Sequence, residues 1–190
     1  GTIISGYSAT AFLKDQISRG EISPADLVQL TQAATRFGLG SLGFSALMTV
    51  HAQYLAGRSE SEYIANSERL FRRAIAKLIY PEARQLIEAH RAAGHSIAII
   101  SSATPYQVMP AAKDLEIEDV YATDLEVVDG QFTGGVIKPT CFGVGKVDAA
   151  ERFAEKRDSS LENCFFYSDS TDDIELLKTA SRPVVLNGSR

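Results

Sequence analysis

Hydrophobic residues follow two different spacings along the chain. Up to about residue 93, apolar side chains recur every three or four positions, which predicts amphipathic helices. We expect these helices over residues 8–19, 23–38, 42–55, 59–78 and 81–93. Their ends carry the usual signals, since Ser23 and Pro24 can begin a helix and Gly57 and Gly94 can end one. The first half of the chain is therefore predicted to be a helical block.

After residue 95 the apolar residues form short continuous runs instead. We expect strands over residues 96–101, 120–123, 164–167 and 183–186, and a hairpin over residues 125–133. The first run is rich in β-branched residues, as is typical of a strand covered on both faces. Asp129 and Gly130 lie between two apolar runs and favour a tight hairpin turn. Because strands and helices alternate in this half, we predict an α/β fold with a parallel sheet.

The composition excludes several kinds of partner. The 190 residues are 45% hydrophobic and 23% charged, as in ordinary globular proteins, and the net charge is −5. Without a basic field, nucleic acid is not an expected partner. No apolar run reaches the roughly 20 residues of a membrane helix, so no membrane segment is predicted. Cys141 and Cys164 lack metal-ligand spacing and fit free thiols in a reducing compartment, so a cytoplasmic protein is expected. The oligomeric state is left open.

Polar residues follow the first predicted strand. Ser101 and Ser102 come just before a helix start at Thr104 and Pro105. A hydroxyl together with free backbone N–H groups at the start of a helix can hold an anion. A plain helix cap would explain the same residues equally well.

Two further groups of polar residues carry charge. Lys146 follows Gly143 and Gly145 at the start of a predicted helix, and a lysine ammonium suits phosphate. A solvated surface lysine is the alternative.

Three carboxylates crowd into residues 169–173, directly after a predicted strand. These carboxylates repel one another unless a cation compensates them, and Mg²⁺ prefers such oxygen ligands. The alternative is a solvated loop with a capped helix.

The order of these groups resembles the haloacid dehalogenase (HAD) superfamily. That family has a hydroxyl after a strand, a lysine that begins a later helix, and an Asp-x-x-x-Asp turn after a further strand; here the turn runs from Asp169 to Asp173. The hairpin over residues 129–134 and the early helical segment resemble its phosphoserine-phosphatase-like branch. Gly1 and Thr2 resemble the tail of the first motif, Asp-x-Asp-Gly-Thr. The resemblance covers essentially the whole chain.

The resemblance implies a HAD-like fold, which is a Rossmann-like parallel sheet core with an inserted all-helical cap. Residues 1–7 would begin the core, residues 8–80 would form the cap, and residues 81–190 would complete the core. The first core strand, which lies in the middle of the family's sheet, would be missing from this sequence. Both ends of the chain are therefore expected to be trimmed.

The resemblance also implies roles for individual residues. Ser102 would hold a phosphate oxygen, and Ser101 is the less favoured candidate for that role. Lys146 would bind the phosphate and act in catalysis by neutralising the nucleophile. Asp169 would bind Mg²⁺, and Asp173 would be a catalytic acid that supports the metal, the water or Lys146.

The implied activity is that of a Mg²⁺-dependent phosphatase that hydrolyses a small phosphorylated metabolite through an aspartyl-phosphate intermediate. The family's nucleophilic Asp and general acid–base Asp would lie three positions and one position before Gly1, so we expect both just upstream of this sequence. One alternative is a non-catalytic domain of this fold that binds a ligand or a protein. Another is the phosphatase-like half of a longer acyltransferase fusion.

Other polar residues are expected to be structural or solvated. Asp172 falls on a position that varies within the family. His51, His90 and His95 have no metal-ligand spacing, so we interpret them as structural or surface residues. The basic residues of the predicted helix over residues 59–78 could meet an anionic substrate, but a solvated face is the preferred interpretation.

Overall fold

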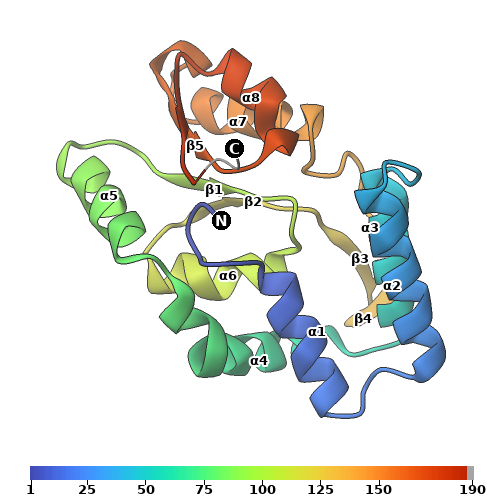
Figure 1. Ribbon diagram of the computed structural model, residues 1–190. Helices are drawn as coiled ribbons and strands as arrows, with labels where there is room; N and C mark the ends of the chain where they lie inside the picture. The colour runs from blue at the N-terminus through green and yellow to red at the C-terminus, as the bar shows by residue number, and fades with distance from the viewer. Residues whose placement is uncertain (188–190) are drawn as a thin grey trace.

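A computed structural model describes residues 1–187 and shows a helical block beside an α/β core (Figure 1). The block is built from four α-helices: α1 (Ser8–Ser18), α2 (Pro24–Gly38), α3 (Phe44–Leu55) and α4 (Glu60–Leu70). Their starts follow the predicted signals. Ser23, for example, accepts a hydrogen bond from the backbone N–H of Asp26 at 3.1 Å and so caps α2. The helical prediction for this half of the chain is confirmed.

The predicted helix over residues 59–78 is not continuous, and this detail of the prediction was wrong. After Leu70 the chain widens into a π-helical turn, η1 (Phe71–Ile75), and then tightens into a 3₁₀ turn, η2 (Ala76–Leu78). Both ends of the wide turn are buried, and its Arg73 forms an ion pair with Asp15 of α1. The ion pair therefore connects η1 to α1.

The core contains two pairs of parallel strands. The first pair is β1 (Ala98–Ile100) and β2 (Asp119–Tyr121), and the second is β5 (Phe165–Ser168) and β6 (Arg182–Val185). The helices of the core are α5 (Pro81–Ala92), α6 (Pro105–Asp114), α7 (Val144–Glu155) and α8 (Ile174–Thr179), with the 3₁₀ turns η3 (Leu161–Asn163) and η4 (Thr171–Asp173). The predicted alternation of strands and helices is confirmed, although the first strand is shorter than the predicted run over residues 96–101.

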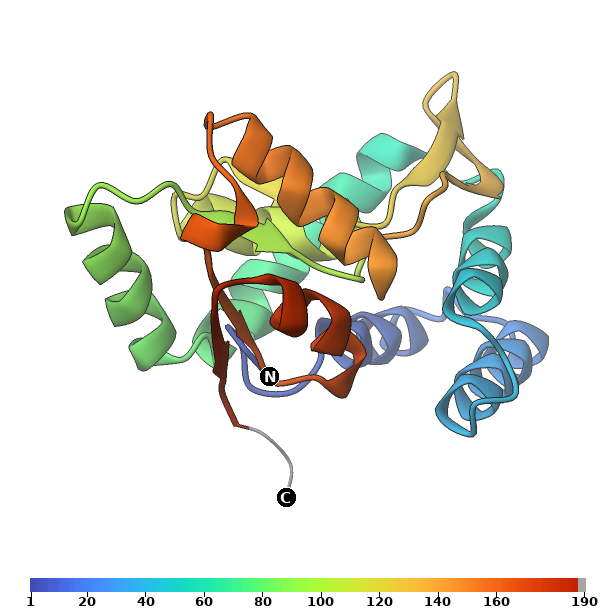
Figure 2. The ribbon, with the colours of Figure 1, turned by 90° about the horizontal axis from the view of Figure 1, so that it is seen from above.

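Among the described residues, the two parallel pairs are not joined into one sheet. A hollow of about 1460 Å³ is lined by residues of both β1 and β5. Residues 1–4 also line this hollow, and Figure 2 shows the N-terminal segment beside β5 and β6. In the part of the chain that the structure describes, each of these four strands thus has one edge without a partner, a state that sheets normally avoid.

The predicted hairpin links the core to the helical block. It consists of β3 (Leu125–Val128) and β4 (Gln131–Val136), and its turn residues Asp129 and Gly130 have φ angles of 50° and 74°. Such paired positive values are typical of the tight turn that Asp-Gly favours. Phe132 of β4 is 2% exposed and accepts a hydrogen bond from the N–H of Gly57, just beyond α3, at 2.8 Å. The hairpin therefore packs on α3.

Burial of apolar side chains holds these parts together. One cluster joins Phe12, Leu55 and Ile75 of the block with Ile99 and Phe132 of the core. A smaller cluster lies under α7 and α8. Within residues 1–187, none of the helices has the length and apolar character needed to cross a bilayer.

Candidate active site

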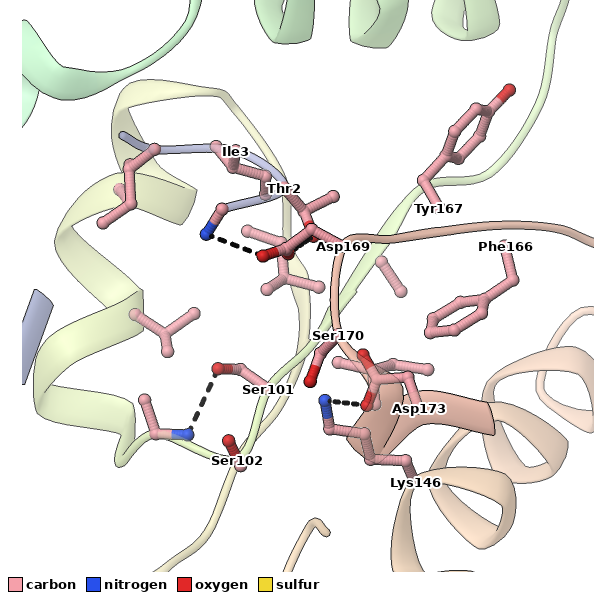
Figure 3. Close-up of a pocket in the computed structure, with 18 of the residues that line it drawn as sticks. Thr2, Ile3, Ser101, Ser102, Lys146, Phe166, Tyr167, Asp169, Ser170 and Asp173 are labelled. Atoms are coloured by element: carbon pink, nitrogen blue, oxygen red, sulfur yellow. Dashed lines mark hydrogen bonds and ion pairs between the residues drawn. The ribbon is translucent and has the colours of Figure 1, made fainter. Parts of the chain in front are cut away.

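Polar residues from three distant parts of the chain line one hollow (Figure 3). Ser102 lies in the turn after β1, and Lys146 lies in the first turn of α7. Asp169 directly follows β5, and Asp173 ends η4, at the start of α8. The carboxyl ends of parallel strands meet at one edge of a sheet, and this is where α/β folds place their ligands. The structure thus brings together the residues that the sequence singled out.

Lys146 and Asp173 form a buried ion pair at the centre of this group. Lys146 Nζ donates a hydrogen bond to Asp173 Oδ1 at 2.5 Å, and the two residues are 7% and 6% exposed. Ser168 Oγ donates to the other carboxylate oxygen, Oδ2, at 2.6 Å. Asp173 is thereby held at both oxygens and fixes the direction of the lysine. An ammonium has three donors, so Lys146 keeps donors for an anion in the hollow.

Asp169 is the carboxylate best placed to meet a cation. Its Oδ1 accepts a hydrogen bond from the Thr2 hydroxyl at 2.6 Å. Partial burial opposes ionisation, while the hydrogen bond from Thr2 lowers the pKa of Asp169. The side chain is therefore an oxygen ligand suited to a cation.

This donor set fits Mg²⁺. Among residues 1–187 no group of three or more His, Cys, Asp and Glu side chains is arranged to cage a metal. Mg²⁺ does not require such a cage, because it usually keeps several waters and uses one or two carboxylates together with substrate phosphate oxygens. Asp169 could supply one of those carboxylates.

The hydroxyl groups after β1 differ in how they are used. Ser101 Oγ accepts a hydrogen bond from the N–H of Ala103 at 3.2 Å, so it is engaged within its own turn. Ser102 lines the hollow beside it, and Figure 3 shows both serines across from Lys146 and Asp173. This arrangement agrees with the choice of Ser102 over Ser101, but the role of either residue stays a prediction.

The neighbours of Lys146 and Asp173 explain other features of the sequence. A Cβ on Gly145 would lie 2.1 Å from the Thr140 carbonyl oxygen, so the glycine allows the backbone to pass closely before Lys146. Ser170 Oγ accepts a hydrogen bond from the N–H of Asp172 and caps the acidic turn. Asp172 itself is exposed, as expected.

Sequence reasoning missed several residues around the hollow. Ser168 was not among the candidate residues, although a hydroxyl next to an acidic turn is a signal for a supporting hydrogen bond. Phe142, in the loop before α7, stacks on Phe44 of α3 with ring centroids 4.3 Å apart and an interplanar angle of 8°. His51, interpreted as structural or surface, lines the hollow from α3, and Gln16 lines it from α1. No local pattern marks these contacts, because they depend on how the helices pack.

The fold and the site define a class of α/β proteins in which a helical block accompanies a polar site at the ends of parallel strands. The chain belongs to the haloacid dehalogenase-like hydrolases, because the profile of that family matches residues 1–178. Solved structures agree with this assignment. A protein of unknown function from Bordetella pertussis superposes with a TM-score of 0.89 at 25% identity, covering 99% of this chain and 86% of that one. A substrate-bound phosphoserine phosphatase superposes with a TM-score of 0.72 at 19% identity, covering 99% and 82%, and shows the shared fold.

Relatives of similar sequence are named as phosphatases. The phosphoserine phosphatase SerB1 of Mycobacterium tuberculosis is 29% identical over 191 residues, covering 98% of this chain and 62% of that protein. The histidinol-phosphatase of Neisseria meningitidis serogroup C is 28% identical over 191 residues, covering 98% and 86%. The chain spans between 62% and 63% of the length of the first curated relatives it matches.

Proposed function

We propose that the complete protein is a Mg²⁺-dependent phosphatase that hydrolyses a small phosphomonoester. The observation that carries this proposal is the meeting of Lys146, paired with Asp173, and the ionised Asp169 at one hollow. Phosphoryl transfer depends mainly on positioning and on neutralisation of charge, and these groups supply both. The phosphatase names of the relatives support the same reaction class.

Each residue then has a distinct task. Ser102 and Lys146 would hold the phosphate oxygens, and Asp173 would keep the Lys146 ammonium in position. Asp169 would hold Mg²⁺, which when bound supplies further positive charge to the phosphate. The two free cysteines suit a reducing compartment, so we propose that the reaction takes place in the cytoplasm.

The nucleophile would come from a strand upstream of Gly1. The family resemblance places an aspartate there, and β1 and β5 leave room for a strand between their unpaired edges. An oxygen of that aspartate would attack phosphorus while the bond from phosphorus to the substrate oxygen breaks. The alcohol would leave with a proton from the second upstream aspartate, and water would then hydrolyse the aspartyl-phosphate.

A metal-dependence assay on the complete gene product tests this function. We expect phosphate release from p-nitrophenyl phosphate with Mg²⁺ and its loss on chelation with EDTA. Asp169→Asn should lower kcat/KM by about 100-fold or more, because the amide carries no charge for the cation.

Glu175→Gln is the matched control, because it removes an exposed carboxylate close to the same turn that does not line the hollow, and it should stay close to the wild-type rate. Equal rates for both variants would remove Asp169 from the site. Binding of phosphate without any turnover would instead support the non-catalytic ligand-binding domain.

A further inference from the structure

The part of the hollow formed by the helical block is lined without a single formal charge. Residues of α1, α2 and α3 line it, among them Phe12, Leu13, Gln16, Leu47, Met48 and His51. No Asp, Glu, Lys or Arg of these three helices is part of the lining. The charged residues that line the hollow come from the core half of the chain: Glu82, Lys146, Arg157, Asp169, Asp172 and Asp173. The hollow thus has a charged end at the core and an uncharged end in the block.

Two nitrogens at the uncharged end have no hydrogen-bond partner. Gln16 is 4% exposed, and its shielded Nε2 has no hydrogen bond of good geometry, although it lies beside the equally unpaired hydroxyl of Tyr63. The Nε2 of His51 is also shielded and unpartnered. A buried polar atom left unpaired costs about 1–3 kcal/mol, so such atoms normally meet a partner in the functional state. Both side chains line the hollow, and a molecule bound there can supply that partner.

His51 does not bring a charge to this end of the hollow. Burial lowers the pKa of His51 to about 4, so its imidazole is neutral at pH 7. A neutral imidazole has one N–H donor and one bare nitrogen acceptor, and an amide offers both kinds of group. The two side chains therefore suit an uncharged polar group such as a hydroxyl.

The carboxylate next to Gln16 in the chain is paired outside the lining. Asp15 forms ion pairs with Arg19, at 2.9 Å, and with Arg73. Asp15 and both arginines are absent from the lining of the hollow. No charged side chain of α1, α2 or α3 is therefore available to pair with a charged group of a molecule in the hollow.

We propose that the substrate is a phosphomonoester whose alcohol part is uncharged and mostly apolar, with a hydroxyl or similar oxygen that bonds to Gln16 and His51. The proposal rests on the phosphatase function proposed above. A substrate ammonium or carboxylate in the block would lose its water without gaining a counter-ion, which is strongly unfavourable. The phosphate would lie at the charged end, near Lys146, and the alcohol part would extend toward α1 and α3.

A set of matched esters tests the proposal on the complete gene product. The probes are hexyl phosphate, 6-hydroxyhexyl phosphate, 6-aminohexyl phosphate and phosphoserine, with p-nitrophenyl phosphate to report general activity. We expect 6-hydroxyhexyl phosphate to have the highest kcat/KM of the four. Its advantage over 6-aminohexyl phosphate and phosphoserine should be about 100-fold, since only these two place a charge in the block.

Variants of the two residues separate substrate binding from a structural role. Gln16→Leu and His51→Phe should each raise KM for 6-hydroxyhexyl phosphate by about 10-fold, the effect of one lost hydrogen bond. KM for hexyl phosphate should not change, because this ester has no oxygen to bond. Gln29→Leu, on the exposed face of α2, is the control and should change neither.

Each other outcome has a defined meaning. If p-nitrophenyl phosphate is hydrolysed and phosphoserine is used as well as the neutral esters, the inference is overturned and the phosphatase function stands. Equal effects of Gln16→Leu and His51→Phe on both hexyl esters, with a lowered Tm, would also overturn it, since they would indicate a structural role. If no ester is hydrolysed, the proposed function fails and the inference fails with it.

Discussion

At the scale of single residues, His51 makes the stability of the protein depend on pH. Its pKa is about 4 in the folded protein, against an ordinary value of 6.5. Between these values the unfolded chain binds a proton that the folded chain does not, so stability falls as the pH falls through this window. Between pH 7 and pH 5 the loss from this group should be on the order of 2 kcal/mol.

Urea denaturation at both pH values, for the wild type and for His51→Phe, measures this contribution. The variant should lose about 2 kcal/mol less stability than the wild type on going from pH 7 to pH 5. Gln29→Leu, on the exposed face of α2, serves as the control and should behave like the wild type. If the wild type and His51→Phe lose the same amount, the imidazole of His51 is not the source of the dependence.

At the scale of elements, the first turn of α7 requires a residue without a Cβ at Gly145. A Cβ on Gly145 would lie 2.1 Å from the Thr140 carbonyl oxygen, and a backbone oxygen cannot rotate away. Gly145→Ala should therefore shift this turn and move Lys146 away from Asp173. A misplacement of about 1 Å can cost about 100-fold in rate, and we expect a loss of that size in kcat/KM.

Steady-state kinetics together with thermal unfolding measure the effect of Gly145→Ala. The control is Gly38→Ala at the end of α2, where an added Cβ meets nothing within 4 Å. It should keep the wild-type rate and Tm. A Gly145→Ala protein with an unchanged rate would show that the turn tolerates the extra methyl group and that Lys146 is not held by this close approach.

The elements also show how far the sequence can predict the structure. The helices, the Asp129–Gly130 turn and the alternation in the second half follow from spacing and turn residues, which are local signals. The gathering of Ser102, Lys146 and Asp169 was predictable because the ends of parallel strands meet at one edge. The wide turn over Phe71–Ile75 was not predictable, since its residues keep a helical pattern. That Gln16 and His51 both line the hollow was not predictable either, because it depends on how the helices of the block pack.

At the scale of the whole molecule, the unpaired edges of β1 and β5 face the same hollow. The N–H of Ser101 donates to Tyr121 of β2, and the carbonyl of Ser168 accepts from the N–H of Leu186, just after β6. Backbone groups alternate in direction along a strand, so the N–H groups of Ile100 and Tyr167 point away from these partners. A strand inserted between β1 and β5 would pair with both.

Amide hydrogen exchange tests whether such a strand is present in the complete gene product. Compared with the 190-residue chain, the complete protein should protect the amides of Ile100 and Tyr167 by about 100-fold or more, because they become bonded in the middle of a sheet. The amide of Phe132, already in the hairpin, is the internal control for local protection. Unchanged exchange at Ile100 and Tyr167 would exclude a strand at this place.

The stacked rings of Phe142 and Phe44 have a consequence for how the protein admits its substrate. Phe142 belongs to the loop that leads into the first turn of α7, and Phe44 begins a helix of the block. If the block swings outward to let a molecule enter, these rings must separate, and the loop before Lys146 loses its support at that moment. A substrate could then enter the cavity only while Lys146 is out of position. Lys146 would reach the position in which it binds phosphate only after the cavity has closed.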